Sequence, residues 1–424
     1  MTGHKHGDGV TPSDWWALFL IVLCYGFYNL DKALLSVLIE PIKTEFQLND
    51  SEMGLLSGLA VSVPFAIACI PIGMLADRVS RRNLIAFLVG GWSLVTGLTS
   101  LAGNVATLFA SRVGIGTFES GFSPASLSQL SDRFPLSLRA TVMGLFALGA
   151  PVGVFMGMAM GGYVEDTYGW RTAFLIAGVP GIILAILLWL TTKEPPRGGT
   201  GEEADLVGKA PPLLSVFRFM VFDPASRNIA LGMTWAASTL AVLAVWTPSL
   251  MRRSFDLSAT DAGLVAGLMI GLGGAIGAAT GGFLADRIGG ESLARKMQVP
   301  IAGAILSALS GLIALLAGLP DGISIALLGI TAFFGQFYIG TSYGVAATLA
   351  GPSRRAVTLS ILLVLFNLIS YALGAGLVGK LSDLMAPAYG AESLRYAYAA
   401  AFIFTLLSLV HFVSAHADLR RRSI

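Results

Sequence analysis

Four ionisable residues interrupt long apolar stretches of the chain, where charged side chains are rare. Arg112 and Glu119 are seven residues apart, a spacing that places both on one face of a helix, about 10 Å apart along its axis. Asp31 and Lys32 are neighbours in an earlier apolar stretch. Because an unpaired charge in an apolar interior is costly, such residues face a cavity and pair with one another. We therefore expect these four residues to form one polar cluster.

Two kinds of chemistry fit this cluster. A carboxyl group held among apolar side chains is suited to carry a proton, and we assign this role to Glu119. Arg112 and Lys32 are suited to pair with Glu119 or to hold an anionic ligand. A buried ion-pair network that only joins two helices would use the same residues, and the sequence leaves that alternative open.

Composition places the chain in a membrane. Of its 424 residues 55% are hydrophobic and only 12% are charged, with a mean hydropathy of +0.75, which excludes a water-soluble class. A helix needs about 20 apolar residues to cross a bilayer, so the length fits a dozen spans with short loops. The formal charge of +2 gives no sign of a nucleic-acid partner. Cys24 and Cys69 fall in apolar runs and are expected to be buried free thiols.

The predicted architecture is an all-α membrane protein with twelve transmembrane helices in two six-helix, pseudo-symmetric bundles. The expected domains are an N-terminal bundle at 1–192, a cytoplasmic linker at 193–227 with a short interfacial helix at 213–222, and a C-terminal bundle at 228–424. The predicted spans are 15–38, 52–76, 83–103, 105–131, 139–163, 171–192, 228–251, 261–285, 298–319, 322–349, 356–381 and 396–416.

Basic residues are distributed unevenly between the two sides of this arrangement. With the N-terminus in the cytoplasm, nineteen of the 27 Lys and Arg residues fall on the cytoplasmic side and six on the other. The positive-inside rule therefore predicts cytoplasmic termini. The N-terminus lacks a cleavable signal pattern, so we expect a multi-pass protein of the inner membrane that retains its first span.

An internal repeat relates the two halves. A shift of 209 residues superimposes Gly54 on Gly263 and Asp77-Arg78 on Asp286-Arg287, and Ser137 recurs as Ser353 after a shift of 216. Two similar halves around a central cavity are typical of carriers that work by alternating access.

The run from Gly73 to Arg82 resembles the signature loop of the major facilitator superfamily, and this resemblance implies the major facilitator fold. An Asp at a helix end can pair with Arg or with the N-terminus of another helix in one conformation and separate in the other. We assign a conformational gate to Gly73, Asp77, Arg78, Arg81, Arg82, Arg139, Asp286, Arg287 and Arg355. A merely cytoplasmic basic loop remains the alternative, above all for Arg81 and Arg82.

The second half carries polar and aromatic groups rather than charges inside its spans. A cavity that is charged on one wall and apolar on the other suits an amphiphile. The expected substrate-binding residues are Arg112, Lys32, Asn29, Phe118, Phe122, Trp235, Phe334, Tyr338 and Asn367. Ordinary packing is the alternative for most of these aromatic residues.

Three stretches of the first half look like the spinster branch of the major facilitators: the run Asn29-Leu-Asp-Lys32, the run from Ser111 to Pro124, and Arg139-Ala140 before Met143. The resemblance implies a proton-linked carrier of a lysophospholipid or a sphingosine-phosphate-like lipid, in which Asp31 and Glu119 act with Arg112. The family pattern usually has Arg where this chain has Lys32, which keeps the charge but loses bidentate geometry.

Two other functions remain open. The anion and proton symporter branch is also similar in span four and at Gly169-Trp170-Arg171, which would imply a small organic anion as substrate. A membrane sensor that binds without transporting could keep the same fold. An enzyme is not expected, since no nucleophile with a base, phosphate loop or metal-ligand set appears. We expect no cofactor other than coupling protons, and a monomer.

Overall fold

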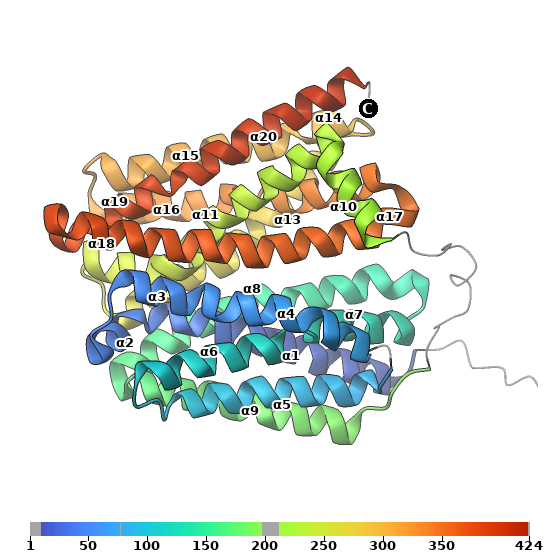
Figure 1. The fold of residues 1–424 in the computed structure, drawn as a ribbon, viewed down its shortest axis with the longest axis horizontal. Coiled ribbons are helices and arrows are strands. Elements are labelled where there is room, and N and C mark those ends of the chain that lie inside the picture. The colour runs from blue at the N-terminus through green and yellow to red at the C-terminus, as the bar shows by residue number, and fades with distance from the viewer. Residues whose placement is uncertain (1–9, 77, 197–211, 423–424) are drawn as a thin grey trace, which may run out of the picture.

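The computed structural model of the chain describes residues 10–76, 78–196 and 212–422, which are almost entirely helical and contain no β-strand (Figure 1). The first half comprises α1 (Pro12–Val37), α2 (Ile39–Phe46), α3 (Asp50–Ser57), α4 (Leu59–Ala76), α5 (Arg81–Thr99), α6 (Val105–Glu119), α7 (Phe122–Arg133), α8 (Leu136–Tyr168) and α9 (Trp170–Thr191).

Helix α10 (Leu213–Phe222) lies between the halves in sequence and covers the residues predicted to form a short helix. The second half comprises α11 (Pro224–Ser254), α12 (Ala259–Ala266), η1 (Gly267–Gly273), α13 (Gly274–Gly289), α14 (Leu293–Lys296), α15 (Gln298–Leu316), α16 (Asp321–Gly335), α17 (Tyr338–Tyr371), η2 (Ala372–Leu377), α18 (Val378–Tyr389), η3 (Gly390–Glu392), α19 (Ser393–Ala400) and α20 (Phe402–Arg421).

Twelve membrane crossings follow from these helices. Nine helical runs in the described part of the chain are long and apolar enough to span a bilayer, and one of them, Ser353–Arg421, turns back at η3 and holds two crossings. The other two are α5, which begins with Arg81 and Arg82, and α6 together with α7. The predicted all-α architecture is therefore confirmed.

The predicted fourth and tenth spans are each interrupted, although the sequence indicated continuous helices. Helix α6 ends at Glu119 and α16 ends at Gly335, positions related by the shift of 216 residues that also relates Ser137 to Ser353. Gly121 lies within the first break, between α6 and α7. An added Cβ atom there would overlap the side chain of Ile72, so the chain passes close to α4 at this point. Apolar residues continue through both breaks, so hydrophobicity alone does not reveal them.

A loop was predicted between the tenth and eleventh spans, at residues 350–355. In the structure these residues lie within α17. Gly351 has φ +71° inside this helix, a left-handed conformation that glycine adopts without a Cβ penalty. The two parts of α17 therefore belong to successive crossings.

The helices gather into two bundles (Figure 1). In the first bundle α1 packs on α8 and α5 on α9, and in the second α11 packs on α20 and α15 on α16. We call the end of the molecule where α1 begins and α20 ends the terminal end, and the opposite end the distal end. The bundles meet mainly where α3 contacts α18 and η2, and where α8 contacts α12 and η1.

Charged groups join the two bundles at the distal end. Arg253 of α11 donates to Asp50 of α3 (2.7 and 2.8 Å) and to Glu40 of α2 (2.7 and 3.0 Å). Asp50 also accepts a hydrogen bond from Ser382 of α18 at 2.6 Å. The bundles are thus tightly joined at the distal end.

Helices α1 and α8 cross at a close contact between Gly26 and Gly153. A Cβ atom at Gly153 would overlap the carbonyl oxygen of Gly26, so Gly153→Ala should force the helices apart and destabilise the protein by about 1–3 kcal/mol. We expect a lower apparent melting temperature in detergent. The control is Gly144→Ala in the same helix, where an added Cβ meets no atom within 4 Å. Equal melting temperatures for the two variants would contradict the tight crossing.

Candidate transport site

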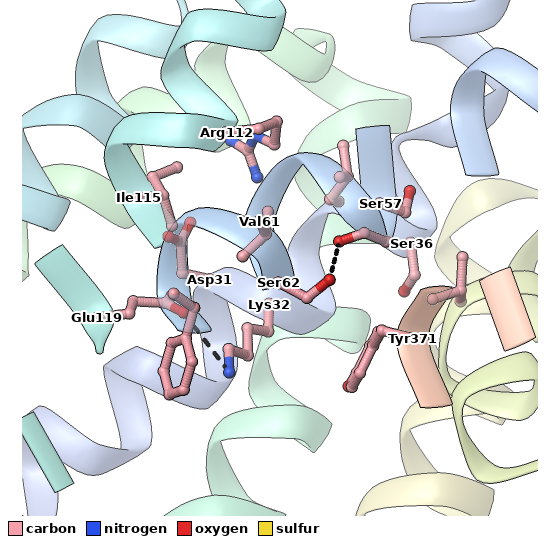
Figure 2. A pocket seen from close by; sticks show the side chains of 14 residues that line it. Asp31, Lys32, Ser36, Ser57, Val61, Ser62, Arg112, Ile115, Glu119 and Tyr371 are labelled. Atoms are coloured by element: carbon pink, nitrogen blue, oxygen red, sulfur yellow. Dashed lines mark hydrogen bonds and ion pairs between the residues drawn. The ribbon is translucent and has the colours of Figure 1, made fainter. Parts of the chain in front are cut away.

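The four charged residues predicted to cluster lie together where α1 meets α6 (Figure 2). Asp31 and Lys32 come from the distal part of α1, and Arg112 and Glu119 lie two helical turns apart on α6. Asp31, Arg112 and Glu119 are each at most 3% exposed. Arg112 and Glu119 therefore share one face of α6, as their seven-residue spacing predicts, and both side chains point toward α1.

Lys32 is the direct partner of Glu119. Its Nζ lies 3.5 Å from Glu119 Oε2, and the side chain of Lys32 is 24% exposed whereas that of Glu119 is fully buried. Lys32 also donates a hydrogen bond of 2.6 Å to Tyr28 Oη, and its Nζ lies 5.5 Å from the ring centroid of Phe65. Glu119 Oε1 has no hydrogen-bond partner among the described residues. The ion pair is loose, with the cation more accessible than the anion.

Asp31 and Arg112 are the second pair of opposite charges, and no ion pair joins them directly in this structure. Asp31 accepts a hydrogen bond of 2.7 Å from Thr96 Oγ1. Arg112 makes a weak 3.5 Å contact with Thr99 Oγ1, and its guanidinium lies 5.2 Å from the ring centroid of Phe174. Aromatic and hydroxyl groups of the first half thus enclose Arg112.

A small cavity of about 50 Å³ lies between the two pairs and the second half. The hydroxyl groups of Ser36, Ser57 and Ser62 line it together with the four charged residues, and Val245 and Tyr371 close it from the second half (Figure 2). A water molecule occupies about 30 Å³ of liquid, whereas sites for small-molecule ligands measure about 300–1,000 Å³. In this conformation the cavity has room for water and not for a substrate.

Other residues predicted to bind substrate lie away from this cavity. Asn29 donates its side-chain amide to Tyr25 O at 2.8 Å, within its own helix. Phe118 points toward α5, where its ring meets Phe87, and Phe122 is fully buried among aromatic residues of the first half. Phe118 lies about 100° around α6 from Glu119 and so faces α5, whereas Phe122 follows the helix break after Glu119. In this structure the cavity wall includes neither of them.

The residues predicted in the second half lie elsewhere. Phe334 and Tyr338 line a separate cavity of about 20 Å³ inside the second bundle, and Trp235 stacks on Phe404 at 5.8 Å between ring centroids. The side chain of Asn367 lies outside the described part of the structure. The amphiphile-binding wall predicted from these residues is therefore not assembled around the charges in this conformation.

Tyr371 and the three serines of the cavity were not predicted. Tyr371 ends α17 and reaches the charged groups only because the second half packs against α3 and α4 at this point. No local pattern marks such a residue, since its position depends on how the bundles meet. Ser57 is the last residue of α3 and directly precedes Gly58, and this glycine is the local signal in the sequence.

The predicted gate residues lie at the terminal end. Arg81 pairs with Asp132 and, at 2.9 Å, with Glu194, both in its own half. In the second half Asp286 pairs with Lys296 at 2.7 Å. Gly73 and Arg81 line a cavity of about 270 Å³. Arg78, Arg287 and Arg355 are exposed, Arg82 and Arg139 are half-buried, and Asp77 lies outside the described residues.

Glu194 organises the terminal end of the first half. Partial burial opposes its ionisation, but hydrogen bonds from the backbone N–H of Arg82 (2.7 Å) and from Arg81 outweigh this and lower the pKa of Glu194. Its carboxylate is therefore charged at neutral pH. The contacts of Arg81 and Arg82 thus tie the basic loop to Asp132 of α7 and to Glu194 in the segment that follows α9.

Comparison with known proteins agrees with this architecture. The chain is 25% identical over 390 residues to an MFS-type efflux pump of Mycolicibacterium smegmatis, covering 92% of this chain and 89% of that protein. It is 27% identical over 393 residues to human protein spinster homolog 1 (87% and 73% covered). It is also 27% identical over 407 residues to an Escherichia coli D-galactonate transporter (91% of each).

A solved structure extends the likeness to three dimensions. The crystal structure of a bacterial homolog to the human lysosomal transporter Spinster, in an inward-facing and unoccupied conformation, matches with a TM-score of 0.88 and 26% identity. The match covers 97% of this chain and 99% of that one. Residues 21–294 match the Major Facilitator Superfamily. The chain therefore belongs to the Major Facilitator Superfamily, as a multi-pass membrane transporter similar to the spinster proteins.

Proposed function

We propose that this protein is a proton-coupled secondary transporter of an amphiphilic anion, such as a lysophospholipid or a sphingosine-phosphate-like lipid. The observation that carries the proposal is the ion pair of Lys32 and Glu119, which lies in a cavity between the two halves. Transport by alternating access requires such a site where both halves can reach it.

Charge balance explains how protons and an anion are coupled. The cluster contains two carboxyl groups and two cations, so it is formally neutral when all four are ionised. An anion that pairs with Lys32 must displace Glu119, which would leave a buried carboxylate without its counter-ion. Protonation of Glu119 removes that cost and frees Lys32. The same step therefore admits a proton and an anion.

The exposures of the two cations support the assignment of roles. Lys32 is partly accessible from the cavity, whereas Arg112 is 2% exposed and lies beside Phe174 and Thr99. We assign Lys32 to the anionic headgroup, and Arg112 to balancing the negative charge of the cluster from its buried position.

An amphiphile fits the surroundings of the charges. Val61, Phe65, Ile115 and Val245 supply apolar wall beside Lys32. An acyl chain can lie against this apolar wall while its headgroup occupies the cavity, once the cavity widens. The similarity to the spinster proteins supports the same class of substrate.

The orientation that we propose places both termini in the cytoplasm and the protein in the inner membrane, as the distribution of basic residues predicts. In that orientation the bundles are joined on the external side, and the cytoplasmic side gives access to the site. The similar solved structure is described as inward-facing, which supports this assignment.

A small organic anion is the second candidate substrate. The likeness to the D-galactonate transporter extends over nearly the whole chain, and the charge argument above applies equally to any carboxylate. A small anion would use the Lys32–Glu119 pair without the apolar wall beside it. Transport of a lipid and of a sugar acid can be compared directly.

Glu119→Gln should abolish transport driven by a proton gradient, because the amide cannot bind or release a proton. The assay is uptake of a labelled lysophospholipid and of labelled D-galactonate by proteoliposomes, with and without an imposed pH gradient. Elution as a single species in size-exclusion chromatography shows that the variant is folded. Glu291→Gln, at an exposed position, is the control. Gradient-driven uptake of either substrate at the wild-type rate by Glu119→Gln would rule out the carrier role.

Lys32→Met should weaken binding of the anionic substrate by about tenfold or more, the loss of one charge-assisted contact. Lys32→Arg should retain most of the affinity, because the charge remains. Calorimetric titration of the purified protein with lysophospholipid measures both. Lys380→Met, which removes an exposed cation at the distal end, is the matched control. If Lys32→Met and Lys380→Met bind equally well, the headgroup lies elsewhere.

A further inference from the structure

Two aspartates in opposite halves each cap a helix of the other half at the distal end. Asp383 of α18 accepts hydrogen bonds from the backbone N–H groups of Asp50 (3.0 Å) and Ser51 (2.7 Å), the first residues of α3. It also accepts a hydrogen bond from the hydroxyl group of Ser51. Both oxygens of this carboxylate are therefore occupied by donors from the first half.

Asp166 makes the same arrangement in the other direction. This residue of α8 accepts hydrogen bonds from the backbone N–H groups of Ala259 (3.3 Å) and Thr260 (2.7 Å), the first residues of α12, and from Thr260 Oγ1 at 2.6 Å. The shift of 209 residues that defines the repeat relates Ser51 to Thr260. Asp166 and Asp383 occupy corresponding ends of α8 and α18, so the two caps are pseudo-symmetric.

Close backbone packing follows each cap. One turn into α3, a Cβ atom at Gly54 would lie 2.5 Å from the carbonyl oxygen of Ala375 in η2. At the equivalent position in α12, a Cβ atom at Gly263 would overlap the carbonyl oxygen of Met158 in α8. Each capped helix therefore rests directly on the helical segment that supplies its cap, and the glycines make this approach possible.

The caps exist only while the halves are together at the distal end. A carboxylate at a helix N-terminus gains from hydrogen bonds to the free N–H groups and from the helix dipole. Here the donors belong to one half and the acceptor to the other, so separation of the halves removes both contributions. We propose that Asp166 and Asp383 are paired latches that hold the distal end closed, and that the transporter opens there by releasing both caps.

The two latches are unequal. Asp383 is half-buried, whereas Asp166 is exposed, so water competes more strongly for the hydrogen bonds of Asp166. We therefore expect removal of Asp383 to shift the equilibrium more than removal of Asp166. Asp50 keeps its contacts with Arg253 and Ser382 when Asp383 is removed, so the distal end should not open completely.

Distances between paired spin labels test the proposal, in a background where both native cysteines are replaced by alanine. Labels on Thr44→Cys of α2 and Ala388→Cys of α18 report separation at the distal end. Labels on Leu136→Cys of α8 and Ile288→Cys of α13 report closure at the terminal end. All four positions are exposed, and pulsed electron resonance in lipid nanodiscs gives the populations.

Asp383→Ala should raise the ratio of open to closed distal populations about fivefold, the ratio that corresponds to one typical helix cap. Asp166→Ala should raise it less, and the double variant more than either. The terminal-end distance should shorten in parallel. Asp321→Ala removes an exposed carboxylate from the first turn of α16, in the second bundle alone, and should change neither distance.

Two outcomes would overturn the proposal. One is an unchanged distal distance in the double variant. The other is distal separation without terminal closure, which would mean that the caps only stabilise the ends of α3 and α12. If the alanine variants fail to fold, Asp383→Asn and Asp166→Asn replace them, because each keeps one acceptor oxygen and should give a smaller shift in the same direction. These readouts need no substrate, so they are independent of the proposed lipid and of proton coupling.

Discussion

Burial of four charges between α1 and α6 is the constraint on which the site depends. A carboxylate as deeply buried as Glu119 is tolerated only with a counter-ion or a proton. Lys32 supplies that counter-ion at 3.5 Å, a distance that leaves the pair easy to separate. Burial also couples the protonation of Glu119 to the binding of an anion by Lys32, because Lys32 is free to bind an anion only when Glu119 is neutral. Coupling of a proton to an anion follows from this balance.

The bundles place this cluster where a conformational change can act on it. The four charges come from the first half, while Tyr371 and Val245 of the second half close their cavity. Contacts at the distal end bring these two residues into place. A movement that separates the bundles there must therefore enlarge the cavity that holds the charges. Separation of the bundles at the distal end and separation of the Lys32–Glu119 ion pair are therefore expected to depend on each other.

Much of this arrangement could be predicted from sequence, for identifiable reasons. The spacing of Arg112 and Glu119 fixes a shared helical face whatever the tertiary structure, and long apolar runs fix the spans. The choice of partner was not predictable, since Lys32 and Arg112 were equally suited to Glu119 by charge and depth. The direction of Phe122 depends on the helix break after Glu119, which hydrophobicity does not reveal. Residues contributed by the other half depend on packing across the interface, which no local pattern encodes.

The most direct test of the account is infrared difference spectroscopy of the purified transporter as lysophospholipid binds. If binding places a proton on Glu119 as the anion takes Lys32, the difference spectrum should contain the C=O band of a protonated carboxyl group. That band should be absent in Glu119→Gln. Tight binding of the lipid to the wild-type protein with no protonated-carboxyl band would contradict the coupling of proton and anion at this ion pair.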